Sequence, residues 1–134
     1  MKSIFELKIS LPFDSDTFER MKKTALELLV NAEKKEYTQA IVLLSGTGRE
    51  YGAVIENALS GDKKDEKALI ECLASANDTK LNHVLCMWRD GGIDIPSFAL
   101  RQMLCDVDDS NNDCGIFVMV DDGYSVIKLE NTMK

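Results

Sequence analysis

Several common sequence features are absent from this chain. It has four cysteines but no Cys-x-x-Cys pair, so it lacks the usual zinc and thiol-redox motifs. No apolar run approaches the roughly 20 residues that span a bilayer. The charged start, Met1 to Glu6, also lacks the apolar stretch of a signal peptide. We therefore expect a cytoplasmic protein with free thiols and no membrane partner.

Basic charge is scarce as well. The 134 residues include 16 Lys and Arg against 23 Asp and Glu, which gives a formal net charge of −7. Such a chain repels phosphate backbones, so we do not expect direct nucleic-acid binding. The same charge speeds the encounter with a basic protein.

Histidine occurs once, and the cysteines lie in ordinary surroundings. No serine or cysteine motif accompanies His83, which lies in a predicted strand. Cys72 and Cys86 lie in apolar stretches, where a small buried thiol is common. We interpret all of these side chains as structural. An alternative that the sequence leaves open is an unorthodox metal site built from His83, Cys86 and Cys105.

The first half of the chain predicts a strand, a helix and a hairpin. Phe5 to Leu11 alternate apolar and polar residues, as a strand with one buried face does. Asp14 to Asp16 offer N-caps for an amphipathic helix over about 15 to 35. The apolar run Thr38 to Ser45, a glycine-rich turn, and Glu50 to Ile55 then predict a β-hairpin.

The second half alternates helix and strand. The charged run Asp62 to Lys67 leads into a helical apolar stripe, and Leu81 to Trp88 have the composition of a buried strand. We expect Asp94 to cap the next helix. Asp106 to Asp113 predict an exposed loop, and Gly115 to Leu129 predict a closing hairpin.

This order of elements predicts the fold class. Helices that alternate with strands and hairpins on both sides of a sheet indicate an α/β protein with three α/β/α layers and a mixed sheet. A chain of 134 residues is long enough for one core. We expect residues 1–134 to form a single domain.

Four short segments resemble a known family. Ile55-Glu56-Asn57-Ala58 follow the first hairpin, Asp65-Glu66-Lys67-Ala68 open the next helix, Pro96 to Leu104 open the third, and Asp122 to Glu130 form the final hairpin. In this order they resemble the nucleoside (cytidine and blasticidin) deaminases over nearly the whole chain. The resemblance implies a cytidine deaminase-like domain to which the N-terminal strand has been added at a sheet edge.

The resemblance also implies what the chain lacks. A zinc deaminase holds its metal with three cysteine or histidine ligands, and a glutamate two residues after the first ligand moves protons. The ligand positions here hold Lys64, Ser97 and Leu100, none of which is a usual zinc ligand. We therefore expect no zinc, no other cofactor and no deaminase activity.

Three further positions match the family in part. Glu66 lies at the proton-shuttle position, although the helix dipole alone also favours a glutamate in a first turn. Glu56 lies at the ribose-contacting position, but Val54 replaces its partner asparagine. Arg101 matches the arginine that opens the third helix, where we expect a structural ion pair.

A deaminase scaffold without its metal most plainly works by binding. Our hypothesis is an acidic immunity protein that binds and neutralises a bacterial toxin such as a basic nuclease. The alternatives are a nucleoside or nucleotide sensor that uses Glu56 and Glu66, and a divergent deaminase. The resemblance also leaves a homodimer open. The candidate partner-binding carboxylates are Asp62, Asp65, Asp106, Asp108, Asp109, Asp113, Asp121 and Asp122.

Overall fold

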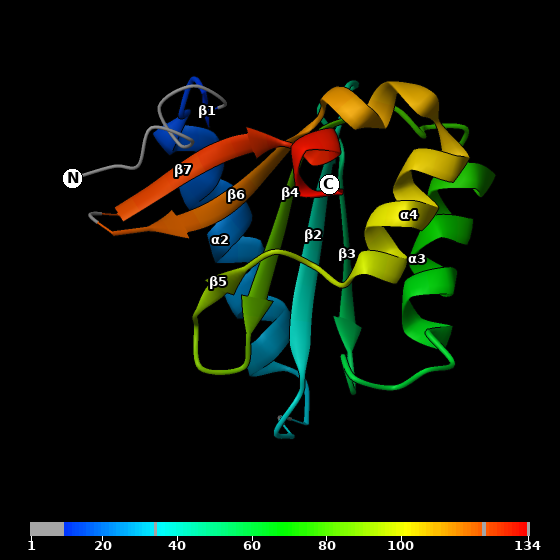
Figure 1. Cartoon of the computed structure of the whole chain (residues 1–134). Helices are drawn as coiled ribbons and strands as arrows, with labels where there is room; N and C mark the ends of the chain where they lie inside the picture. The colour runs from blue at the N-terminus through cyan, green and yellow to red at the C-terminus, as the bar shows by residue number, and fades with distance from the viewer. Residues whose placement is uncertain (1–9, 34, 122, 134) are drawn as a thin grey trace.

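A mixed seven-stranded sheet forms the centre of the protein (Figure 1). The computed structural model describes residues 10–33, 35–121 and 123–133. The strands lie in the order β1-β7-β6-β4-β2-β3, and β5 pairs with β4. Only β4 and β6 run parallel among the described pairs, because α4 carries the chain back between them. The strands are β1 (Ser10–Leu11), β2 (Gln39–Ser45), β3 (Glu50–Ile55), β4 (Leu81–Trp88), β5 (Ile93–Asp94), β6 (Gly115–Val120) and β7 (Gly123–Lys128).

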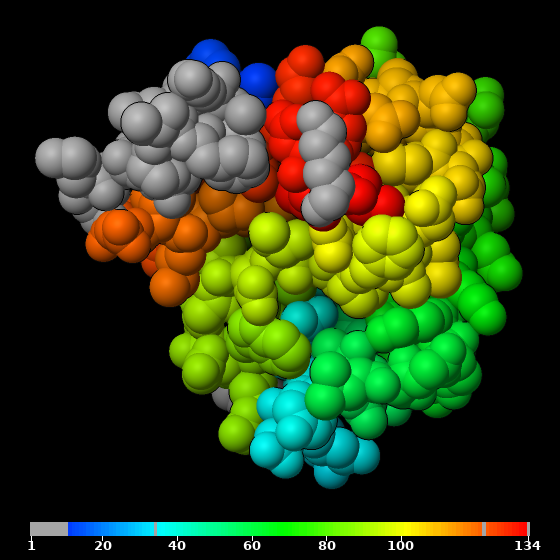
Figure 2. All heavy atoms as spheres, viewed as in Figure 1, coloured from blue at the N-terminus to red at the C-terminus, as the bar shows by residue number. Residues whose placement is uncertain are grey.

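Helices cover both faces of this sheet. Helix α2 (Ser15–Val30) packs on one face, and α3 (Lys64–Ser75) and α4 (Phe98–Val107) pack side by side on the other. Two 3₁₀ turns, η1 (Asp109–Asp113) and η2 (Leu129–Thr132), flank the last hairpin. In the space-filling view, yellow α4 lies between green α3 and the red C-terminal segment (Figure 2). The predicted three-layer α/β/α architecture is confirmed.

Two apolar cores follow from this arrangement. All seven residues of β2 are buried, because helices cover both sides of the central strands. The helical spacing that the sequence showed is the spacing that fills each core. On the α2 side, Phe18, Met21, Ala25 and Leu29 pack on Val42, Leu85 and Phe117. On the other side, Leu69, Leu73, Leu100 and Leu104 pack on Ile41, Ile55 and Ile116.

The added N-terminal strand lies at the sheet edge, as predicted. Its last two residues form β1, which pairs with β7 in an antiparallel register. The rest of the predicted strand, Phe5 to Ile9, lies outside the described residues. No helix in the described residues has the length and apolar character to cross a membrane.

Two helix boundaries differ from the prediction. Helix α2 begins after the predicted cap, Asp14, whose carboxylate accepts from the Thr17 amide at 3.2 Å. It ends at Val30 and not near residue 35, because the sequence from Glu33 to Glu36 is entirely polar and cannot continue the buried stripe.

The cap of α4 was also predicted at the wrong residue. Asp94 does not cap this helix, because it ends β5 and its carboxylate accepts from the Trp88 indole at 2.9 Å. The cap is Ser97, whose hydroxyl oxygen accepts from the Leu100 amide at 3.2 Å. Pro96 precedes the cap and separates β5 from the helix.

The segment Asp106 to Asp113 is not the exposed loop that its composition predicted. Asp106 belongs to α4, and η1 follows it with Asn111 fully buried. The Asn111 amide nitrogen donates to the carbonyls of Thr79 and Leu104, at 2.8 and 2.9 Å. Its oxygen accepts from the Leu81 amide at 2.8 Å. This side chain therefore joins α4 to the start of β4.

We predict that Asn111→Ala will destabilise the fold strongly. The substitution leaves three buried backbone groups without partners, which costs roughly 3 kcal/mol of unfolding free energy. Urea unfolding followed by circular dichroism measures this loss. The control Asn112→Ala removes two contacts that are less buried, one to the Asp109 carbonyl and a weak one from the Cys105 thiol, and should cost under about 1 kcal/mol. Equal losses in the two variants would refute this role of Asn111.

Candidate functional site

Glu56, Lys64 and Glu66, half of the positions that resemble the deaminases, lie together where β3 ends and α3 begins. Glu56 directly follows β3, and Lys64 to Glu66 form the first turn of α3. The two segments are joined because the Glu56 amide donates to the Asp65 carboxylate at 3.0 Å. The Thr38 hydroxyl donates to the Glu56 carbonyl at 3.1 Å and fixes the other side. Glu56 thus has a fixed backbone and an exposed side chain.

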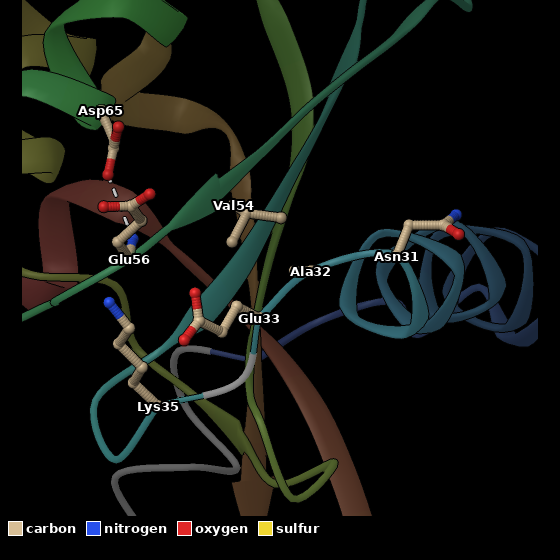
Figure 3. A pocket seen from close by; sticks show the side chains of 7 residues that line it. All are labelled: Asn31, Ala32, Glu33, Lys35, Val54, Glu56 and Asp65. Carbon is tan, nitrogen blue, oxygen red and sulfur yellow. Dashed lines mark hydrogen bonds between the residues drawn. The ribbon is translucent and has the colours of Figure 1, made fainter.

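A hollow of about 300 Å³ opens beside Glu56. Glu33 and Lys35 lie at the same end of the hollow as Glu56, whereas the Asn31 side chain lies apart at the end of α2 (Figure 3). A second hollow of about 170 Å³ adjoins it and shares Glu56 and Asp65. The first is lined by Asn31, Ala32, Glu33, Lys35, Val54, Glu56 and Asp65. The second adds Asn57, Ser60, Asp62, Lys64 and Glu66.

The described lining of these hollows is acidic. Two ammonium groups, on Lys35 and Lys64, face a larger set of carboxylates. Hydrogen bonds from the Lys64 amide and the Ser60 hydroxyl hold the pKa of Asp62 below its usual value, so this carboxylate stays charged. The site suits a cationic ligand better than a phosphate. The carboxylates are those of Glu33, Glu56, Asp62, Asp65 and Glu66.

Glu66 is buried, although its neighbours in the charged run are exposed or half-buried. Only 3% of the residue is accessible, and its carboxylate lies 3.6 Å from the Lys63 ammonium. Lys63 also donates to the Ala58 carbonyl at 2.7 Å. The helix dipole still favours Glu66 in this first turn, but the dipole alone does not explain the burial. A buried carboxylate needs a partner, and Lys63 supplies one.

The side chains at the three positions that resemble the zinc ligands of the deaminases do not fit a zinc ion. Lys64 is exposed and carries its own positive charge. The Ser97 hydroxyl is engaged as the cap of α4. Leu100 is 1% exposed and packs in the apolar core beneath α3. In the described ranges, no three His, Cys, Asp or Glu side chains are grouped as metal ligands.

Arg101 does not form the ion pair that we expected. Its guanidinium makes no salt bridge in the part of the chain that the structure describes, and donates to backbone carbonyls instead. It reaches Pro96 at 2.9 Å and Thr132, in η2, at 2.6 Å. Arg101 therefore joins the start of α4 to the C-terminal segment.

The structure separates His83 from Cys86, two members of the alternative metal site. His83 stacks on Phe117, with ring centroids 5.0 Å apart, and Phe117 belongs to the core under α2. Cys86 is buried in the other core, under α3 and α4. Odd and even residues of a strand face opposite sides of a sheet, so these two side chains do not converge.

The predicted partner-binding carboxylates fall in three separate places (Figure 1). Asp62 and Asp65 lie at the start of α3, at the lower end of the sheet in this view. The group from Asp106 to Asp113 lies at the opposite end, around η1, and Asp121 lies at the β6–β7 turn. Asp122 is outside the described residues.

Several of these carboxylates already have partners within the chain. Asp108 accepts from the hydroxyls of Ser110 and Thr79, at 2.7 and 3.0 Å. Asp106 accepts from Gln102 at 3.0 Å, and Asp113 lies 3.4 Å from the Lys128 ammonium. Asp109 is exposed at the start of η1. Asp62 and Asp65, unlike the other two groups, lie beside the hollows that adjoin Glu56.

Sequence reasoning missed two residues of this site. Glu33 and Lys35 were assigned to the last turn of a long helix, but they lie in the connection between α2 and β2 and line the hollow. The available signal was their polarity, since the apolar stripe of α2 has already ended.

Comparisons with known proteins support the fold. The cytidine deaminase of Mycobacterium leprae superposes with a TM-score of 0.64 at 21% identity, over 87% of this chain and 96% of that one. The cytidine deaminase of Mycobacterium tuberculosis gives 0.61 at 16%, over 86% and 92%. That of Burkholderia pseudomallei gives 0.62 at 14%, over 84% and 93%. No family model and no curated protein matches the chain. The chain therefore has a cytidine deaminase-like fold.

We predict that Lys63→Met will destabilise the protein by about 3 kcal/mol, because it leaves the buried Glu66 carboxylate without a countercharge. The double variant Lys63→Met/Glu66→Leu should recover most of this loss, since no charge then remains buried. Urea unfolding of the single and double variants measures both effects. The control Lys64→Met changes an exposed neighbour and should stay within about 0.5 kcal/mol. Additive losses in the double variant would contradict the pairing.

Thiol reactivity should follow burial. Burial raises the pKa of the Cys86 thiol, and it raises that of Cys114 to about 12, so few thiolates form at neutral pH. We expect Cys72, which is exposed, to react with a thiol reagent in the native protein, and Cys86 and Cys114 to react only after unfolding. Mass spectrometry of the labelled peptides identifies the sites. Rapid native labelling of Cys86 would contradict the packing of the core.

Proposed function

We propose that this chain is a non-catalytic deaminase-fold protein that binds a basic protein partner. In its most specific form it is an immunity protein that neutralises a bacterial toxin. The observation that carries the proposal is the contrast between the three positions that resemble zinc ligands and the hollow beside Glu56. The metal-ligand positions are occupied by a surface lysine, a helix cap and a core leucine, while the acidic hollow beside Glu56 stays open.

The chemistry of the hollow favours lysine and arginine side chains. Glu33 and Glu56 are exposed, so their carboxylates are free to accept charge-assisted hydrogen bonds from a partner. The net charge of −7 adds a long-range attraction that speeds the approach of a basic protein. Binding over the active surface of a basic nuclease would block its access to nucleic acid.

The proposal implies that a basic toxin is encoded beside this chain, and the test is co-expression with that toxin, together with calorimetry on the purified pair. We expect restored growth and tight binding that weakens with salt. Glu56→Lys should weaken binding at least about tenfold, because it places like charges together. The matched control Glu71→Lys, on the exposed side of α3, should bind as the unsubstituted chain does. If the unsubstituted chain neither binds the toxin nor restores growth, the proposal is refuted.

A second candidate is a nucleoside sensor, favoured by one specific observation. The volume of the hollow beside Glu56 lies at the lower end of the range for small-molecule pockets. Glu56 also lies at the position that resembles the ribose contact of the deaminases. At 10 mM nucleoside, a Kd near 1 mM stabilises the fold by about 1.4 kcal/mol. A thermal-shift series with cytidine and uridine measures this. An unchanged unfolding midpoint would exclude the nucleoside sensor. Turnover of cytidine would exclude both the sensor and the non-catalytic immunity protein, and would identify the chain as a divergent deaminase.

A further inference from the structure

Strand β3 forms an edge of the sheet whose outward backbone groups are not paired with another strand in the described part of the chain. It is the last strand in the sheet order, and β2 is its only strand partner among the described residues. Its six residues pair with β2 without a register shift, and the segment Glu50 to Ile55 contains no lysine and no proline. Proteins usually protect such an edge with a bulge, a lysine or a proline. None of these devices is present on β3.

The register identifies the backbone groups that face outward. The Ser45 amide donates to the Arg49 carbonyl at 2.9 Å, so this pair is hydrogen-bonded. In an antiparallel ladder, bonded and non-bonded pairs alternate. Glu50, Gly52 and Val54 therefore each direct an N–H and a C=O away from β2. The next outward amide, that of Glu56, is already taken by Asp65, which marks where the open edge ends.

A groove runs along this open edge. The hollow beside Glu56 continues into a third hollow of about 380 Å³ between α2 and β3, and the two share Asn31, Ala32 and Val54. Leu28 of α2 forms the apolar floor and lies directly over Gly52, since a Cβ on Gly52 would approach its Cδ1 to 2.8 Å. The groove therefore offers an apolar strip beside unpaired backbone groups.

Charge selects among the segments that could occupy this groove. The described lining has four carboxylates and one ammonium, that of Lys35. A second copy of this chain, paired edge to edge through β3, would bring the same carboxylates face to face, which is unfavourable. A basic segment would meet complementary charge at both ends of the strip. The carboxylates are those of Glu27, Glu33, Glu56 and Asp65.

We propose that β3 accepts an extended basic segment of a partner protein as an added strand. This inference rests on the proposed function, and it names the surface and the mode of binding. The outward N–H and C=O groups of Gly52 and Val54 pair with the segment backbone. Apolar side chains of the segment lie over Leu28 and Val54, and its lysines or arginines face the carboxylates at the groove ends. Alternation along a strand permits both kinds of contact.

The experiment titrates a blocked peptide of alternating valine and lysine or arginine into the ¹⁵N-labelled full chain. We expect shifts concentrated on β3 and the end of α2, slower hydrogen exchange at the amides of Gly52 and Val54, and binding that weakens with salt. A peptide of the same length with glutamate in place of the basic residues should not bind. Shifts confined to another surface, or none at millimolar peptide, would overturn the proposal.

Variants separate strand addition from simple charge attraction. Val54→Pro removes an outward donor but leaves the ladder to β2 intact, since this amide faces away from β2. It should weaken peptide binding at least about tenfold, and Glu33→Lys should do so by charge. Glu71→Lys is the charge control and should have no effect. If Val54→Pro does not fold, Glu33→Lys and the exchange data still decide the matter.

The outcomes distinguish this inference from the proposed function. Peptide binding along β3 without any binding of the neighbouring toxin refutes the immunity proposal and supports the open edge. Toxin binding that Glu56→Lys weakens but Val54→Pro leaves unchanged supports the immunity proposal and overturns strand addition on β3.

Discussion

The ion pair between Lys63 and Glu66 is the interaction on which the site depends. Glu66 is buried at the start of α3, and its charge is tolerable there because the Lys63 ammonium lies 3.6 Å away. The same ammonium binds the Ala58 carbonyl and so ties the preceding connection to the helix. Lys63 adopts a left-handed backbone with φ of +51°, which costs energy in a residue other than glycine. The pair offsets that cost.

The position of this turn fixes the rest of the site. Once α3 begins at Lys64, the Asp65 carboxylate reaches the Glu56 amide and closes the edge of β3 at that point. Glu56 then projects beside Glu33 and Lys35, which follow the early end of α2. A hollow thus lies beside Glu56, while the Ser97 hydroxyl caps α4 and Leu100 packs in the core.

The sequence predicted the elements that depend on periodicity. The stripe from Phe18 to Leu29 lies where its helical spacing placed it, because burial of one helix face enforces a period of 3.6. The continuous apolar run of β2 also lies where predicted, because helices cover both faces of this strand. The resemblance supplied the cytidine deaminase-like domain and the edge position of the added strand, but the strand order was not predicted, because no local pattern contains it. The resemblance also led to Ser97 and Leu100 as positions without zinc ligands, and the structure shows what each side chain does instead.

The errors arise where tertiary contacts overrule local composition. Asn111 lies in a polar, acidic segment, so nothing local distinguishes it as the buried side chain that joins α4 to β4. Asp94 and Ser97 are both good caps, and the pairing of β5 with β4 decides between them. The burial of Glu66 depends on Lys63, three residues earlier, in a backbone conformation that lysine seldom adopts. The open edge of β3 depends on the strand order and is invisible in the sequence.

The central claim is that structural side chains occupy the three positions that resemble the zinc ligands of the deaminases. The most direct measurement is zinc content by elemental analysis, on protein purified without a metal-affinity tag and then dialysed against excess zinc. The account predicts far less than one zinc per chain, because Lys64, Ser97 and Leu100 provide no suitable ligands. One tightly bound zinc per chain would contradict this account and would make zinc-dependent deamination the favoured function.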